Sequence, residues 1–122
     1  MKLRIKGNSI RIRLSKSEVD YFGTIGYLEE IIEFGNSELV YALQSIMNSI
    51  EITANFEGNT ITVLIPENLK KEWVGTDQIS LENKVDIGVG KQLFLLIEKD
   101  FVCLDNTAED QSDNYPNPNA TC

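Results

Sequence analysis

Apolar and polar residues alternate with a period of two along much of the chain, a pattern that predicts β-strands. The clearest case is the segment 2–14, in which two alternating runs flank Gly7-Asn8. Glycine at the first central position suits a two-residue type II′ turn, so this segment is predicted to be a hairpin. Its register would place Arg4 opposite Arg11, with the charged side chains gathered on one face.

The rest of the chain predicts two short helices and seven further strands. A Ser-x-x-Glu capping box at Ser15 begins the first helix, which Gly23 or Gly26 can end, and Pro66 opens the second helix over residues 67–74. The further strands are expected at residues 27–34, 38–46, 50–56, 61–65, 78–81, 85–89 and 92–102. The last of these is apolar on both faces, so we expect it at the centre of the sheet.

The segment Gly-Asn-Ser-Ile at 7–10 returns as Gly-Asn-Thr-Ile at 58–61, 51 residues later. The chain can therefore be interpreted as strand, helix and three strands written twice after one extra strand, or as one good hairpin turn used twice. Both interpretations predict an α+β fold, a curved antiparallel sheet of about eight or nine strands with two short helices. Such a sheet could close into a barrel, which would remove its edges.

The length fits one domain, which we assign to residues 1–104. Residues 105–122 are polar, acidic and proline-bearing, and we expect them to form an extended C-terminal strap packed on the domain. The longest apolar run, 93–97, is far shorter than the roughly 20 residues that cross a membrane. Because the first residues also lack the apolar core of a secretory signal, we expect a cytoplasmic protein without a membrane partner.

Charge is divided unevenly along the chain, whose net charge is −8. Residues 1–16 contain six lysines and arginines and no acid, so the remainder is strongly acidic. An acidic protein repels the phosphate backbone over most of its surface, which argues against nucleic-acid binding.

Five of the six cations would share the outer face of the first hairpin, because side chains alternate along a strand. We call this set the basic face: Lys2, Arg4, Lys6, Arg11 and Arg13. Like charges directly opposite each other destabilise a sheet, so we expect a negative partner. Three partners stay open: the C-terminal strap, through Glu109, Asp110 and Asp113; carboxylates of a neighbouring strand, among Glu29, Glu30, Glu33 and Glu51; or an external anion held by arginine forks.

The chain has no histidine, which removes the usual general base and the usual metal ligand. Its two cysteines, Cys103 and Cys122, are too few for a zinc site, and whether they pair stays open. We therefore expect no cofactor and no metal, assign no catalytic residue, and favour a binding protein over an enzyme. The sequence leaves the oligomeric state open.

Motifs at both ends resemble a family of small uncharacterised bacterial proteins. The resemblance rests on residues 1–11, on Lys-Asp-Phe-Val-Cys-Leu at 99–104, on Glu-Asp-Gln-Ser-Asp at 109–113, on Tyr-Pro-Asn-Pro at 115–118 and on Cys122. It implies a stand-alone cytoplasmic protein and no particular activity.

A second resemblance is architectural. The doubled order of elements is similar to that of the CYTH-like triphosphate tunnel enzymes, whose barrels bind triphosphates with inward lysines and arginines and a carboxylate-held metal. Their first strand reads Glu-x-Glu-x-Lys, and here only Lys6 fits, because Lys2 and Arg4 replace the two carboxylates. The resemblance implies the barrel and a polyphosphate-type substrate, but it does not carry the metal site.

Three hypotheses follow. The first is a non-catalytic binding module whose basic face takes a small anion, phosphorylated or carboxylated, or an acidic protein segment. The second is a tunnel phosphohydrolase relative acting on a polyphosphate-type substrate. The third is a structural or interaction protein whose C-terminal strap neutralises the basic face.

Overall fold

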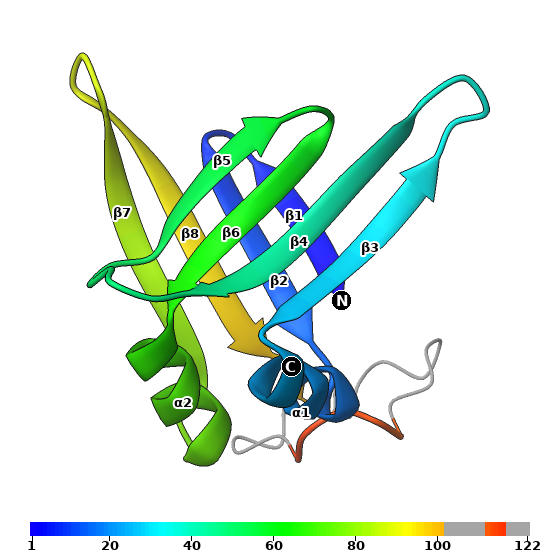
Figure 1. Ribbon diagram of the computed structural model, residues 1–122, viewed down its shortest axis with the longest axis vertical. Coiled ribbons are helices and arrows are strands. Elements are labelled where there is room, and N and C mark those ends of the chain that lie inside the picture. The colour runs from blue at the N-terminus through cyan, green and yellow to red at the C-terminus, as the bar shows by residue number, and fades with distance from the viewer. Residues whose placement is uncertain (102–111, 117–122) are drawn as a thin grey trace.

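Two four-stranded sheets face each other in the computed structural model, which describes residues 1–101 and 112–116 (Figure 1). Sheet A has the order β1-β2-β8-β7 and consists of β1 (Lys2–Lys6), β2 (Ser9–Leu14), β8 (Lys91–Lys99) and β7 (Ser80–Gly88). Sheet B has the order β3-β4-β6-β5 and consists of β3 (Tyr27–Glu33), β4 (Glu38–Ile46), β6 (Thr60–Pro66) and β5 (Thr53–Glu57). The α+β class is thus confirmed.

Two helices carry the chain between the sheets and lie together at one end (Figure 1). Helix α1 (Lys16–Ile25) leads from sheet A to sheet B, and α2 (Glu67–Gly75) leads back. The capping box predicted at Ser15 is present, and α1 ends at Gly26 with a left-handed φ of 81°. Both helices therefore begin and end close to the residues that the sequence indicates.

The single antiparallel sheet expected from the sequence is wrong, and the strands of the described residues do not close into a barrel. All four hairpins turn at the end of the molecule opposite the helices (Figure 1). Strands β2 and β8 both run from a turn toward the helices, so they pair in parallel, and so do β4 and β6. The result is two mixed sheets, each with two edge strands that have one partner.

Three strands differ from their predictions by more than one residue. β5 begins at Thr53 instead of residue 50, and β8 ends at Lys99 instead of residue 102. The segments 78–81 and 85–89, expected as two strands, form the single strand β7. The polar Asn83 interrupts the apolar pattern of its inner face, but its side-chain amide donates a 2.8 Å hydrogen bond to the carbonyl of Ile52, and this bond lets it remain there. Strand β8 lies between β2 and β7, as its two apolar faces predict.

The repeat is present, with a different unit. The element order is two strands, a helix and two strands, written twice. The halves exchange hairpins, because sheet A joins β1–β2 of the first half to β7–β8 of the second, and sheet B does the reverse. The registers correspond as well: Arg4 pairs with Arg11 in β1–β2, and Asn55 pairs with Thr62, 51 residues later, in β5–β6.

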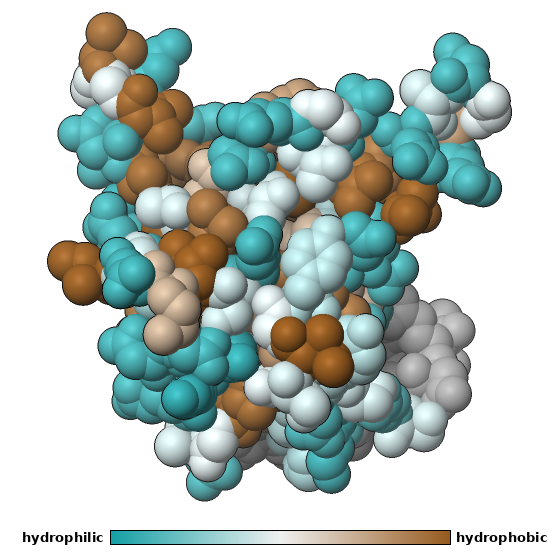
Figure 2. Space-filling model, in the orientation of Figure 1, coloured by the Kyte–Doolittle hydropathy of each residue, from teal (hydrophilic) through white to brown (hydrophobic). Residues whose placement is uncertain are grey.

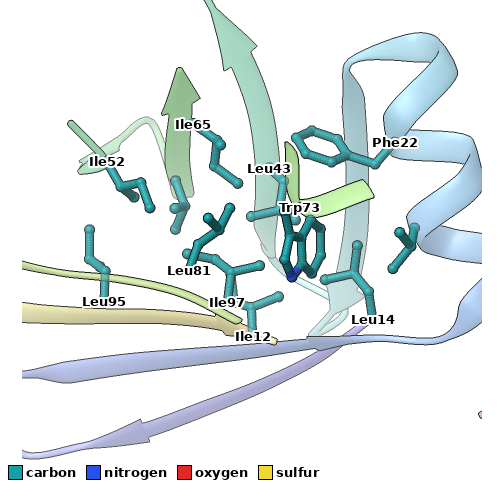
Figure 3. Packing of buried hydrophobic residues seen from close by; sticks show 12 residues of the cluster. Ile12, Leu14, Phe22, Leu43, Ile52, Ile65, Trp73, Leu81, Leu95 and Ile97 are labelled. Carbon is teal, nitrogen blue, oxygen red and sulfur yellow. The ribbon is translucent and has the colours of Figure 1, made fainter. Parts of the chain in front are cut away.

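The hydrophobic core lies between the sheets near the helices, with Trp73 among residues of both sheets (Figure 3). Equivalent positions of the two halves supply it: Ile12 and Val63, Leu14 and Ile65, and Phe22 and Trp73 are each at most 1% exposed. Toward the turns the inner faces of the sheets become exposed to solvent: the equivalent inner-face residues Ile5 and Phe56 are 58% and 66% exposed.

Candidate functional site

The basic face lies on the outer side of sheet A, at its β1–β2 edge. The predicted register is confirmed, with Arg4 opposite Arg11 and Lys2 opposite Arg13. The three cations of β1 are exposed, whereas Arg11 and Arg13 on β2 are half-buried because β2 has neighbours on both sides. Two pairs of like charges therefore face each other, as the sequence predicts.

Glu98 of β8 is the counter-charge that the two arginines of β2 share. Its Oε1 atom accepts a 2.7 Å hydrogen bond from Nε of Arg11 and a second, short one from Nε of Arg13. Burial tends to raise the pKa of Glu98, but the hydrogen bonds and charges of the two arginines outweigh it and hold that pKa below its ordinary value. Glu98 is thus an ionised counter-charge built into the sheet.

The sequence reasoning missed Glu98 as the partner. Carboxylates of a neighbouring strand were among the expected partners, but the residues named for that role were Glu29, Glu30, Glu33 and Glu51. Glu98 comes into contact because β2 pairs in parallel with β8, which places it opposite Arg13. The alternation of residues in β8 could have identified Glu98, because it puts Glu98 on the same face as Phe94 and Leu96.

The remaining three cations of the basic face differ in their ionic contacts. Nζ of Lys2 lies 2.9 Å from a carboxylate oxygen of Asp100 at the end of β8. Within residues 1–101 and 112–116, Arg4 and Lys6 form no ion pair. Arg4 and Lys6, the two cations of the basic face without an ion pair in the described ranges, both lie near the β1–β2 turn, where positive charge is therefore in surplus.

A hollow of about 270 Å³ opens beside this surplus charge. Its charged rim consists of Arg4, Lys6 and Arg11, and its remaining lining is Ser9, Ile10, Phe94 and Leu96. The structure thus brings together three of the five predicted site residues, while Lys2 and Arg13 lie further toward the helix end of the sheet.

The described part of the C-terminal segment contacts α1. Both carboxylate oxygens of Asp113 accept hydrogen bonds from Ser17, one from its backbone N–H and one from its hydroxyl, and the Asp113 carbonyl accepts the N–H of Lys16. Asp113, expected on the basic face, is therefore placed at the first turn of α1. Tyr115 packs its ring on Phe101, with centroids 5.6 Å apart. Glu109, Asp110, Cys103 and Cys122 lie outside the described residues.

No group of three acidic or cysteine side chains that could hold a metal ion occurs in the described ranges. No helix in the same ranges is long and apolar enough to cross a membrane.

Comparison with known proteins gives one match. A model of a family of unknown function, DUF7009, matches residues 1–119. The chain belongs to this family. Neither the curated proteins nor the solved structures yielded a match to this DUF7009 chain. The predicted resemblance to a family of uncharacterised proteins is thus confirmed, and it assigns no activity.

Proposed function

We propose that this DUF7009 protein is a non-catalytic binding module that holds a small anion, phosphorylated or carboxylated, on its basic face. The observation that carries the proposal is the surplus of positive charge at the hollow. Glu98 pairs with Arg11 and Arg13, and Asp100 pairs with Lys2. Arg4 and Lys6 have no ionic partner in the described ranges.

The repeat supports this proposal, because the same hairpin forms without the charges. The counterparts of the basic face in β5–β6 are, in order, Thr53, Asn55, Glu57, Thr62 and Leu64. They occupy the same register on a strand pair of the same kind. Cations opposite cations make a ladder less stable, so the fold gains nothing from Arg4 facing Arg11. A bound anion would explain why these residues are cations, which the fold does not require.

The chemistry suits phosphate or carboxylate groups. Arginine presents a planar fork of donors to two oxygens at once, and lysine adds a mobile point charge. Glu98 bonds to Nε of Arg11, which fixes the orientation of its guanidinium and, among the described residues, leaves its terminal nitrogens available. An anion in the hollow would complete the neutralisation that Glu98 begins.

The tunnel phosphohydrolase hypothesis has lost its architectural basis, because it rested on a closed barrel. The two carboxylates closest to the cations in the described ranges, Glu98 and Asp100, are already ion-paired. Binding is therefore the activity that the geometry favours.

Thermal unfolding with and without inorganic phosphate tests the proposal. A ligand that binds the folded state raises stability, by about 2.7 kcal/mol when its concentration is one hundred times its Kd. We expect a rise in the unfolding midpoint at low salt that shrinks at high salt, because exposed charges are screened.

Two variants make this result specific. The double variant Arg4→Ala/Lys6→Ala should lose the phosphate-dependent rise, and Lys71→Ala, which removes an exposed cation of α2, should keep it. Phosphate also stabilises proteins generally by being excluded from their surface. An equal rise in the wild type and the double variant, or no rise in the wild type, would therefore contradict anion binding at this site.

A further inference from the structure

Strand β8 is apolar on both faces although the described protein covers only one of them. Leu95 and Ile97 point into the core, where they are at most 1% exposed. Phe94 and Leu96 alternate with them and lie on the outer face of sheet A. In the described ranges that face has no third layer over it, because sheet B packs on the other side and the helices lie at the end of the sheets (Figure 1).

A strand with two apolar faces is normal where both faces are covered. Here the outer apolar pair is half-buried by its neighbours in the sheet and forms the floor of the 270 Å³ hollow, beside the charges of Arg4, Lys6 and Arg11. The same site therefore combines an apolar surface with a cluster of cations.

The second half of the molecule lacks this combination. The parallel strand pairs correspond, with Ser9 opposite Phe94 in sheet A and Thr60 opposite Val40 in sheet B. The next outward position of each central strand is Leu96 in sheet A and Ala42 in sheet B. The smaller side chains thus occur where the cations are missing. Figure 2 shows this face of sheet B toward the viewer, with hydrophilic and hydrophobic residues interspersed.

We propose that the ligand is a compact amphipathic anion, in which a phosphate or carboxylate group is attached to a flat apolar body such as an aromatic ring. The anionic group binds Arg4, Lys6 and Arg11, and the ring packs on Phe94 and Leu96. This inference rests on the proposed anion binding and adds the chemical class of the ligand.

The size of the hollow limits the ligand. Pockets for drug-sized molecules measure roughly 300–1,000 Å³, so a hollow of about 270 Å³ accepts one ring with one anionic group. An inorganic anion would leave the apolar floor exposed to water, and a neutral aromatic molecule would leave the cations without a partner.

A matched pair of phosphate monoesters tests this inference. Methyl phosphate and phenyl phosphate carry the same anionic group, and only phenyl phosphate has a ring. Titrations at low salt should give phenyl phosphate a Kd roughly threefold to tenfold lower, the range expected for one aromatic contact. Benzyl alcohol, which has the ring without the charge, should bind more weakly than either monoester.

Two variants locate the ring. Phe94→Thr keeps a good strand former on the outer face, and it should abolish the advantage of phenyl phosphate over methyl phosphate. Val40→Thr, at the equivalent position of sheet B, should keep the advantage. Equal affinities of the wild type for the two monoesters would overturn the amphipathic ligand and leave anion binding intact. Failure to bind either monoester would overturn both. The wild-type affinities for the two monoesters decide between these outcomes even if Phe94→Thr does not fold.

Discussion

The two hairpins β1–β2 and β5–β6 have similar inner faces and different outer faces. On the inner side, Ile12 corresponds to Val63 and Leu14 to Ile65, and all four are buried in the common core. On the outer side, the five cations of β1–β2 correspond to residues that include no cation. The two strand pairs nevertheless share turn position, register and direction.

The fold and the candidate site therefore depend on different residues of the same hairpin. Burial of apolar surface is the main favourable term in folding, and it is supplied from equivalent positions in both halves. The outer charges bury no apolar surface, and where like charges face each other they destabilise the sheet. The counter-charge also differs between the sheets. Glu98 faces Arg13 in sheet A, whereas the uncharged Gln44 faces Leu64 at the equivalent position of sheet B.

The largest effects should come from the shared core. Phe22→Ala and Trp73→Ala each remove a fully buried aromatic ring from equivalent helix positions, and each should lower the free energy of unfolding by about 3–5 kcal/mol. Denaturant unfolding measures both. Trp73 also donates a 3.0 Å hydrogen bond to the carbonyl of Ile79, so its loss should be at the upper end. A loss below about 1 kcal/mol for either variant would show that the two halves do not share the core equally.

A smaller effect is expected from the counter-charge. Glu98→Gln removes the ionic partner of Arg11 and Arg13 and should lower the free energy of unfolding by about 1–2 kcal/mol, since both arginines stay partly exposed to solvent. The same substitution frees two guanidinium groups, so phosphate should bind more tightly to the variant. Lower stability with weaker phosphate binding would contradict the role given to Glu98.

The pH dependence of stability sharpens this result. Because the pKa of Glu98 in the folded protein lies below its ordinary value of 4.5, its contribution is complete above pH 4.5 and is lost as the pH falls through the folded value. Unfolding measured between pH 6 and pH 3, roughly the range in which carboxylates titrate, should show a shallower decline for Glu98→Gln. The decline should persist in part, because the pKa values of Glu18 and Glu67 are also lowered. Identical declines would exclude an ionised Glu98 as a source of stability.

The smallest effect is expected on the uncharged hairpin. Asn55→Thr, at the position equivalent to Arg4, should change the free energy of unfolding by no more than about 0.5 kcal/mol, because the side chain is exposed on an edge strand. Its phosphate response in thermal unfolding should match the wild type. If Asn55→Thr abolished the phosphate-dependent rise of the unfolding midpoint, the anion site would lie on sheet B instead of sheet A.

Local features of this chain could be predicted from the sequence because their partners are close along it. The register of β1–β2 and the capping box at Ser15 depend on residues within one turn or helix. The parallel pairing of β2 with β8 joins residues more than eighty positions apart, and no local pattern encodes it. The two-sheet architecture, the role of Glu98 and the hollow above Phe94 all follow from that pairing, so the sequence indicated the cations and not their surroundings.

Exchanging outer-face residues of sheet A for those of sheet B shows whether the cations serve a ligand or the fold. The variant Arg4→Asn/Arg11→Thr/Arg13→Leu/Glu98→Gln gives sheet A the residues that sheet B has at the equivalent positions. Its thermal unfolding should be measured at low salt with and without phosphate. The variant should unfold at or above the wild-type temperature without phosphate, because the repulsion between Arg4 and Arg11 is gone. Phosphate should raise its midpoint less than it raises that of the wild type, because only the general effect of exclusion is left. Unfolding well below the wild-type temperature, or an undiminished phosphate response, would contradict the assignment of these cations to a ligand.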